Sequence, residues 1–347
     1  MSAKRLSGKR IIVTAVALMV AVALAAPAWA QQAPIKWKAQ TLWNPQERPQ
    51  KTFEDFCKRI KVLTNGRLEI EPYPAGAIVP TNETLTALQG NVLQVLHVWP
   101  GYFSGRNPAF AALCDLIFAY EQPWELDAFL HYRGGIELLR ELYKPFGAYP
   151  VGVMVWGVES WPSKKPIRNM EDFKGVKIRE PQGMEAEFMA KAGASVVVLP
   201  GTEIFSALDK GVVDATNWAT VSINNQTGFH QVAPYFSYPG FHSMPVGDFT
   251  VRQADWDKLP DDIKQILTSA CREWAWDTIE KVAMDDAKVV SEAKSKGLTP
   301  IAWAPEERAK ARQIAQEIWQ GWKAKNEQTK RVIEAQEAWL REIGRIQ

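Results

Sequence analysis

Two residues with opposite charge lie at the ends of segments that are expected to be β-strands. Arg179 ends the run 176–179, and Glu159 follows the apolar run 151–158. A guanidinium is always charged and offers paired donors to a planar carboxylate, which suits Arg179 to an acidic ligand or, equally, to a surface ion pair. Glu159 would repel such a ligand. It must therefore meet a ligand hydroxyl, be protonated, pair with a cation or point away.

Further polar and aromatic candidates also follow expected strands or occupy loops. Asn217 can hydrogen-bond a ligand oxygen or serve as a turn residue, and His242 can donate to a ligand or fix its loop. The fifteen tryptophans would mostly pack in cores, while a few in loops would form apolar pocket walls. The remaining candidates are Trp43, Asn44, Tyr102 and Trp218.

The sequence lacks the common motifs of catalysis and nucleotide binding. It has no GxGxxG, GxxxxGK[ST], GxSxG or HExxH, and its four histidines show no metal-ligand spacing. This is the pattern expected of a binding protein. The alternative is a periplasmic isomerase or lyase that acts on a small organic acid, with Glu159 or His242 as the base.

The elements that must position these residues form two successive α/β units. The first is expected to have strands at 35–40, 67–72 and 92–99 and helices at 47–64 and 82–88. Hydrophobic periodicity and turn residues predict the second unit. Its strands are expected at 151–158, 176–179, 196–198 and 212–214, and its helices at 185–192 and 202–210. Ligands of open α/β sheets bind beyond the carboxyl ends of the strands, so a cleft between two lobes is expected.

The N-terminus predicts secretion. Four basic residues precede the apolar run 11–26, and Ala28-Trp29-Ala30 fits a signal-peptidase site, which predicts cleavage after Ala30 and a periplasmic protein. Removing four basic residues changes the net charge from +2 to −2, which gives no electrostatic basis for nucleic-acid binding. The three cysteines are far apart, and buried thiols are favoured over one disulfide.

The remaining chain of about 317 residues exceeds the size of a single core, which predicts two lobes. The predicted organisation is a signal peptide at 1–30, an N-terminal α/β lobe at 31–150, a second α/β lobe at 151–250 and helices at 251–347 that pack on and link the lobes.

Three stretches resemble the solute-binding proteins of TRAP transporters, the DctP-like family. They are the strand motif 172–179, the segment from Pro200 to Ala215, and Trp256 with 258–263. The resemblance implies a two-lobed periplasmic-binding-protein-like fold with a ligand cleft and long C-terminal helices. It also implies a non-enzymatic receptor whose Arg179 binds the carboxylate of a small organic acid.

The chain is most similar to the branch of this family that binds 2-oxo acids. This implies a 2-oxo or 2-hydroxy monocarboxylate ligand, possibly aromatic, with Trp218 and Tyr102 shaping the site. Asn217 stands where that branch has a glutamate that ligates a metal ion, so no cofactor is expected and a sodium or calcium ion is in doubt. The implied partners are the membrane subunits of the transporter, and a homodimer through the C-terminal helices is left open.

Overall fold

The computed structural model of the protein describes residues 33–347, and the compact unit Lys36–Gln347 contains the features discussed below. The predicted signal peptide and its cleavage site lie outside the described residues. Within this part of the chain, none of the helices combines the length and the apolar character needed to cross a membrane.

The first sheet has five strands, of which two come from the middle of the chain. Its strands are β1 (Ile35–Thr41), β2 (Leu68–Tyr73), β3 (Val95–His97), β4 (Ala148–Val155) and β10 (Val246–Arg252). Their order is β2-β1-β3-β10-β4, with β1 parallel to β3 and β10 antiparallel to both β3 and β4. β10 is therefore paired along both edges, and all of its residues except Arg252 are buried.

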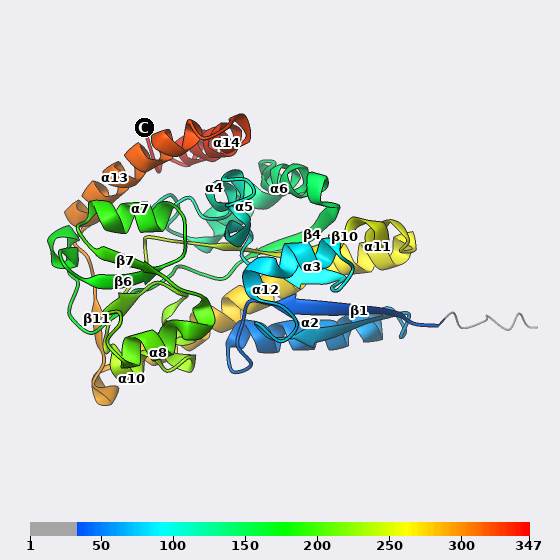
Figure 1. Cartoon of the computed structure of the whole chain (residues 1–347), viewed down its shortest axis with the longest axis horizontal. Helices are drawn as coiled ribbons and strands as arrows, with labels where there is room; N and C mark the ends of the chain where they lie inside the picture. Colours follow the sequence, from blue (N-terminus) through cyan, green and yellow to red (C-terminus); the bar gives the residue numbers. More distant parts are fainter. Residues whose placement is uncertain (1–32) are drawn as a thin grey trace, which may run out of the picture. The chain divides into compact units, whose positions relative to one another are not determined.

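The second sheet has six short strands. They are β5 (Pro162–Ser163), β6 (Lys177–Glu180), β7 (Ser195–Val198), β8 (Ala215–Thr216), β9 (Tyr235–Ser237) and β11 (Thr299–Ile301). Their order is β11-β9-β5-β8-β6-β7, and β6 lies parallel to both β7 and β8. The carboxyl end of β6, where Arg179 lies, is thus flanked by the carboxyl ends of two parallel strands. Figure 1 shows β6 beside one of them, β7.

Two sequence-based expectations about strands are corrected. The run 151–158 does not open a second sheet, because β4 pairs along its length with β10 in the first sheet. The strand expected at 212–214 is a turn, in which the amides of Val212 and Val213 bond to the carbonyl of Ala207, and β8 begins only at Ala215. The lobe boundaries at 150 and 250 stay predictions, although β4 and β10 span both positions within one sheet.

Helices cover the sheets and join them. Those that precede β10 are α2 (Arg48–Leu63), α3 (Thr84–Gln89), α4 (Ala109–Cys114), α5 (Pro123–Tyr132), α6 (Gly135–Tyr143), α7 (Met184–Lys191), α8 (Ile204–Asp209), α9 (Val221–Gln226) and α10 (Phe229–Val232). Those that follow it are α11 (Gln253–Asp257), α12 (Asp261–Glu292), α13 (Pro305–Lys323) and α14 (Glu327–Glu342). As expected, the C-terminal third is largely helical.

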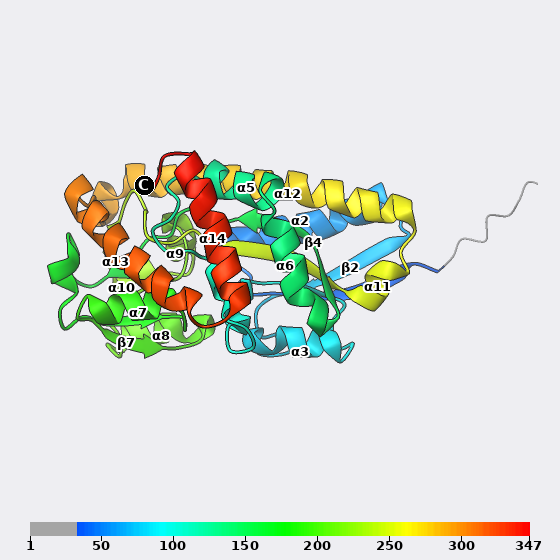
Figure 2. The ribbon, with the colours of Figure 1, turned by 90° about the horizontal axis from the view of Figure 1, so that it is seen from above.

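Helix α12 is the longest element and extends past both sheets (Figure 2). It packs on α2 and β4 of the first sheet and on α9 near the second. Its buried residues Ile263, Leu267, Ala270 and Trp274 recur every three or four positions, which is the spacing of one helix face. Helices α13 and α14 form a second bridge, because α13 packs on α7 and α14 packs on α4.

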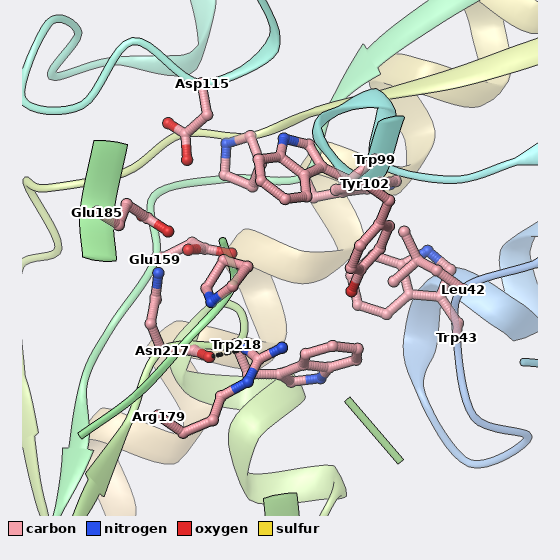
Figure 3. A pocket seen from close by; sticks show the side chains of 13 residues that line it. Leu42, Trp43, Trp99, Tyr102, Asp115, Glu159, Arg179, Glu185, Asn217 and Trp218 are labelled. Atoms are coloured by element: carbon pink, nitrogen blue, oxygen red, sulfur yellow. Dashed lines mark hydrogen bonds between the residues drawn. The ribbon is translucent and has the colours of Figure 1, made fainter. Parts of the chain in front are cut away.

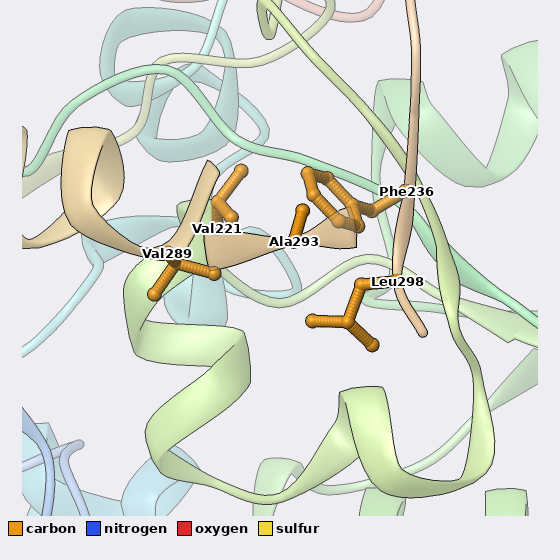
Figure 4. Close-up of a cluster of buried hydrophobic side chains, with 5 residues drawn as sticks. All are labelled: Val221, Phe236, Val289, Ala293 and Leu298. Carbon is orange, nitrogen blue, oxygen red and sulfur yellow. The ribbon is translucent and has the colours of Figure 1, made fainter. Parts of the chain in front are cut away.

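A small apolar cluster attaches the end of α12 to the second sheet (Figure 4). It consists of Val221, Phe236, Val289, Ala293 and Leu298, all buried. Each larger apolar side chain contributes about 1.5–3 kcal/mol when fully buried, so the cluster stabilises the contact between the end of α12 and the second sheet. The chain also crosses between the sheets at 156–161 and 238–245, and these segments contribute residues to the site.

Candidate functional site

A small polar and aromatic cavity is lined by residues from elements of both sheets (Figure 3). Its volume is about 40 Å³, room for roughly three water molecules at 10–15 Å³ each. It is lined by Leu42, Trp43, Trp99, Tyr102, Asp115, Trp156, Glu159, Arg179, Pro181, Glu185, Asn217, Trp218 and Pro245. A cleft of about 640 Å³ shares six of these residues, so a larger ligand would extend into it.

Arg179 lies at the carboxyl end of β6 and is only 2% exposed. Its Nε donates to the carbonyl of Leu199 at 3.0 Å, and its Nη1 donates to the carbonyl of Asn217 at 2.6 Å. A guanidinium has five N–H donors, so three are left, including both on Nη2. The two carbonyl bonds fix the plane of the group and leave its outer edge available for a planar anion.

Tryptophan rings form much of the cavity wall. Trp43 meets Trp156 edge to face with ring centroids 4.7 Å apart, and Trp218 lies 5.9 Å from Trp43. Trp218 also packs against the Arg179 guanidinium, and its indole N–H donates to Oε1 of Glu47 at 2.8 Å. Because Glu47 follows β1 and Trp218 follows β8, this bond joins the two sheets across the cleft.

Three glycines provide the space that the wall tryptophans occupy. A Cβ on Gly101 would lie 2.1 Å from the ring of Trp99, and one on Gly201 would lie 2.2 Å from the ring of Trp218. A Cβ on Gly247 would approach the third ring, that of Trp156, to 2.0 Å. Real Cβ atoms do not come this close, so any larger residue would displace the ring.

A group of buried acids forms the opposite end of the cavity from Trp43 (Figure 3). Oγ of Ser243 lies 2.7 Å from a carboxyl oxygen of Asp115 and 2.9 Å from one of Glu159. A hydroxyl has one proton to donate, so the second contact requires a protonated carboxyl group that donates to Ser243. Glu185 at the start of α7 is 6% exposed, and its Oε1 has no partner among the described residues.

The acids favour their neutral forms. Burial raises the pKa of Asp115 to about 6, although hydrogen bonds from Ser243 and Met244 oppose the rise. Burial raises the pKa of Glu180, which lies beside Arg179 in sequence, to about 8. The pKa values of Glu159 and Glu185 are also raised well above the usual range, first by burial and then by the charge of Asp115.

His242 lies behind the cavity rather than on its wall. It stacks on Trp161 with ring centroids 3.8 Å apart, and its Nε2 is 3.2 Å from Oδ1 of Asn217. Burial lowers the pKa of His242 well below its usual value, which favours the neutral ring. The ring therefore fixes the amide of Asn217.

Glu159, Glu185 and His242 each place one ligand atom within 4.8 Å of the others, a grouping that could hold a metal ion. The set is mixed, because carboxylates suit sodium or calcium and imidazole suits transition metals. With the carbonyl of Asn217, this chain offers three side-chain oxygen donors, whereas calcium takes six to eight oxygens. Ligand and water oxygens would have to complete such a site.

Six of the eight predicted site residues line the cavity: Trp43, Tyr102, Glu159, Arg179, Asn217 and Trp218. Asn44 and His242 do not line it. Asn44 instead donates its backbone N–H to Oε2 of Glu47 at 2.5 Å. Their assignment to ligand binding stays a prediction.

Sequence reasoning missed Asp115, Glu185 and Trp156 as lining residues. Asp115 ends the short helix α4, and no local pattern sets it apart from a capping residue. Trp156 lies inside the run 151–158 that was expected to be a strand, and Glu185 is the second residue of α7, so no sequence signal marked either as a site residue. The three cysteines are free and buried among the described residues, as favoured from the sequence.

Two α/β sheets that are joined by crossing segments and a long helix, with a polar cavity lined from both, define a two-lobed solute-binding protein. The chain belongs to family 7 of the bacterial extracellular solute-binding proteins, the DctP family, whose sequence profile matches residues 40–326. The family assignment, the fold class and the receptor function predicted from the sequence are thereby confirmed.

Individual relatives agree with this assignment. The chain is 28% identical over 312 residues to a monocarboxylate 2-oxoacid-binding periplasmic protein of Nostoc sp. strain PCC 7120, covering 89% of this chain and 85% of the relative. A TRAP periplasmic solute-binding protein of Rhodobacter sphaeroides, in an apo open structure, is 34% identical with a TM-score of 0.73, covering 89% and 99%.

A third relative was solved with ligands. The TRAP periplasmic solute-binding protein of Pseudoalteromonas atlantica, with bound sodium and pyruvate, is 26% identical with a TM-score of 0.78, covering 89% of this chain and 95% of that one. These relatives are transport receptors, and they give the isomerase or lyase alternative no support. This chain is therefore an extracytoplasmic receptor of a TRAP transporter.

Proposed function

We propose that this receptor captures a small monocarboxylate of the 2-oxo or 2-hydroxy class for uptake, with Arg179 binding the carboxylate. The observation that carries the proposal is the geometry of Arg179, which is buried, fixed by two carbonyls and left with three N–H donors beside the cavity. A carboxylate there would receive two parallel charge-assisted hydrogen bonds. The 2-oxoacid-binding relative supports the same ligand class.

Neighbouring residues would supply shape and selectivity. Trp218 and Trp43 would cover the ligand, and the hydroxyl of Tyr102 would donate to a ligand oxygen. Asn217, held by His242, would bond to the 2-oxygen. The wider cleft leaves room for an aromatic substituent. An acid of this class would contact residues from both sheets and favour an arrangement in which the two lobes close around it.

Calorimetric titration of residues 31–347 with aliphatic and aromatic acids tests the proposal. Arg179→Ala should weaken binding by roughly 100-fold or more, because loss of a buried charged donor costs several kcal/mol. Arg179→Lys keeps the charge without the fork and should weaken binding by roughly tenfold or more. The matched control is Arg168→Ala, since Arg168 is an exposed arginine paired with Asp172. Unchanged affinity in folded Arg179→Lys and Arg179→Ala proteins would refute the role of Arg179.

We further propose that binding requires no cofactor. Sodium or calcium, if bound, would be held by Glu159 and Asn217 together with the ligand. Titrations in buffer treated with a chelator, then with calcium or sodium restored, separate the two cases. Binding that vanishes with the chelator and returns with the ion would overturn the cofactor-free proposal.

The remaining predictions concern the cellular setting. Cleavage after Ala30 should release a periplasmic protein that starts at Gln31, which N-terminal sequencing of the exported protein checks. The membrane subunits of the transporter should bind the loaded receptor, and a second copy of the chain is a further candidate partner through the C-terminal helices. Recovery of the bound acid unchanged after long incubation would agree with a receptor that performs no chemistry.

A further inference from the structure

The residues around the cavity include both hydrogen-bond donors and hydrogen-bond acceptors that have no partner among the described residues. Arg179 retains three N–H donors, and the buried indole N–H groups of Trp43, Trp99 and Trp156 have no acceptor among the described residues. On the acidic side, Oε1 of Glu185 has no donor. Buried polar groups are nearly always paired, so such a site suits a ligand with acceptors at one end and donors at the other.

The charges of the lining residues point the same way. Three acids line the cavity, Asp115, Glu159 and Glu185, against the single cation Arg179. Behind them lies Glu180, which is fully buried with neither carboxyl oxygen paired. A ligand that carries only a carboxylate satisfies Arg179 but leaves Oε1 of Glu185 without a donor. A ligand that also carries a positive charge satisfies both ends.

We propose that the site also takes, and prefers, the 2-amino counterpart of the 2-oxo and 2-hydroxy acids, a zwitterion whose carboxylate binds Arg179 and whose ammonium group binds Glu159 and Glu185. This inference rests on the proposed carboxylate site at Arg179 and names the substrate class that completes it. An ammonium group has three N–H donors, enough for the unpaired oxygen of Glu185, an oxygen of Glu159 and a third acceptor.

The donor set of the acidic end suits an ammonium group better than a metal ion. An ammonium group needs three acceptors, which carboxyl oxygens can supply. A metal ion instead requires several oxygen ligands, and the third member of the acidic grouping is the imidazole of His242. Raised pKa values of Glu159 and Glu185 in the ligand-free protein agree with acids that lack a cationic partner.

The test compares acids that differ only at carbon 2. L-Alanine, pyruvate and L-lactate form one set, and L-phenylalanine, phenylpyruvate and L-phenyllactate form the other. Each is titrated calorimetrically into residues 31–347 in chelator-treated buffer. We expect the amino acid of at least one set to bind roughly tenfold or more tightly than its 2-oxo and 2-hydroxy counterparts, since a hydrogen bond between charged groups is worth about that factor.

Two variants locate the effect. Glu185→Gln should reduce the preference for the amino acid roughly tenfold or more and leave the 2-oxo acid bound at least as tightly. The control Glu171→Gln removes the same charge from an exposed side chain outside the cavity and should change neither affinity. An unchanged preference in a folded Glu185→Gln protein would overturn the assignment.

The outcomes separate this inference from the proposed function. Tighter binding of a 2-oxo or 2-hydroxy acid in chelator-treated buffer would overturn the zwitterion and keep the carboxylate receptor. Binding of the 2-oxo acid only after calcium or sodium is added would also overturn it, because the acids would then hold a metal ion. Failure of all six acids to bind would overturn both.

Discussion

Substituting Glu47 by glutamine tests how the contact across the cleft depends on pH. Glu47 is fully buried, and its two carboxyl oxygens accept from the indole N–H of Trp218 at 2.8 Å and from the backbone N–H of Asn44 at 2.5 Å. Both bonds favour the charged carboxylate, but burial outweighs them and raises the pKa of Glu47 from 4.5 to about 7. Glutamine fills the same space and does not titrate.

The sign and size of the effect follow from this pKa. The folded protein binds the Glu47 proton more tightly than the unfolded chain does. Proton binding by Glu47 therefore contributes its full stabilisation below pH 4.5, and this contribution is lost as the pH rises through about 7. The shift corresponds to about 3 kcal/mol, of which about 2.5 kcal/mol is lost between pH 5 and pH 8. Glu47→Gln lacks this term and loses one accepted bond at every pH.

Urea unfolding of both proteins at pH 5 and pH 8 measures the difference. The free energy of unfolding of the wild type, relative to Glu47→Gln, should fall by about 2.5 kcal/mol between the two pH values. Other titrating groups are common to both proteins and cancel. The exposed Glu171→Gln should show no such change relative to the wild type. A parallel pH dependence in wild type and Glu47→Gln would refute the reasoning that burial holds a proton on Glu47.

Two further predictions concern the cavity wall and the thiols. Gly247→Ala should displace the ring of Trp156, lower the free energy of unfolding by about 1–3 kcal/mol and weaken ligand binding, whereas Gly105→Ala, with open space around its Cβ, should stay within about 0.5 kcal/mol. Urea midpoints and calorimetry decide this, and equal effects of the two alanines would contradict it. The cysteines are buried and free, and burial raises their pKa values, so a thiol reagent should label none in the native protein and three in urea. A single thiol in urea without reductant would instead reveal a disulfide.

Much of the local structure is determined by short-range patterns and was predictable. The stripe of Ile263, Leu267, Ala270 and Trp274 specifies a helix because its spacing matches the helical repeat, and the helix forms with that stripe buried. The strands β1, β2 and β6 lie within one residue of their predicted bounds for the same reason. The resemblance at 172–179 led to Arg179, which the structure places on the cavity wall.

Sheet membership was not predictable, because strand pairing joins segments that are far apart in the chain. The apolar run that forms β4 predicts a strand but does not indicate which of the two sheets the strand joins. Only its pairing with β10, about 100 residues later, assigns it to the first. Connections between sheets depend on the free energy of the whole packed arrangement, which a local pattern does not contain.

The sequence by itself determined the class of protein and the arginine that suits a carboxylate, and it predicts a signal for export. The tertiary structure alone decided that Asp115, Glu159 and Glu185, which lie up to 70 positions apart, gather at one cavity. It also decided that Gly101, Gly201 and Gly247 make room for three tryptophan rings. The physical reason is the same in each case: burial, charge repulsion and steric fit depend on distances in space, and these are fixed only when the two sheets and α12 pack together.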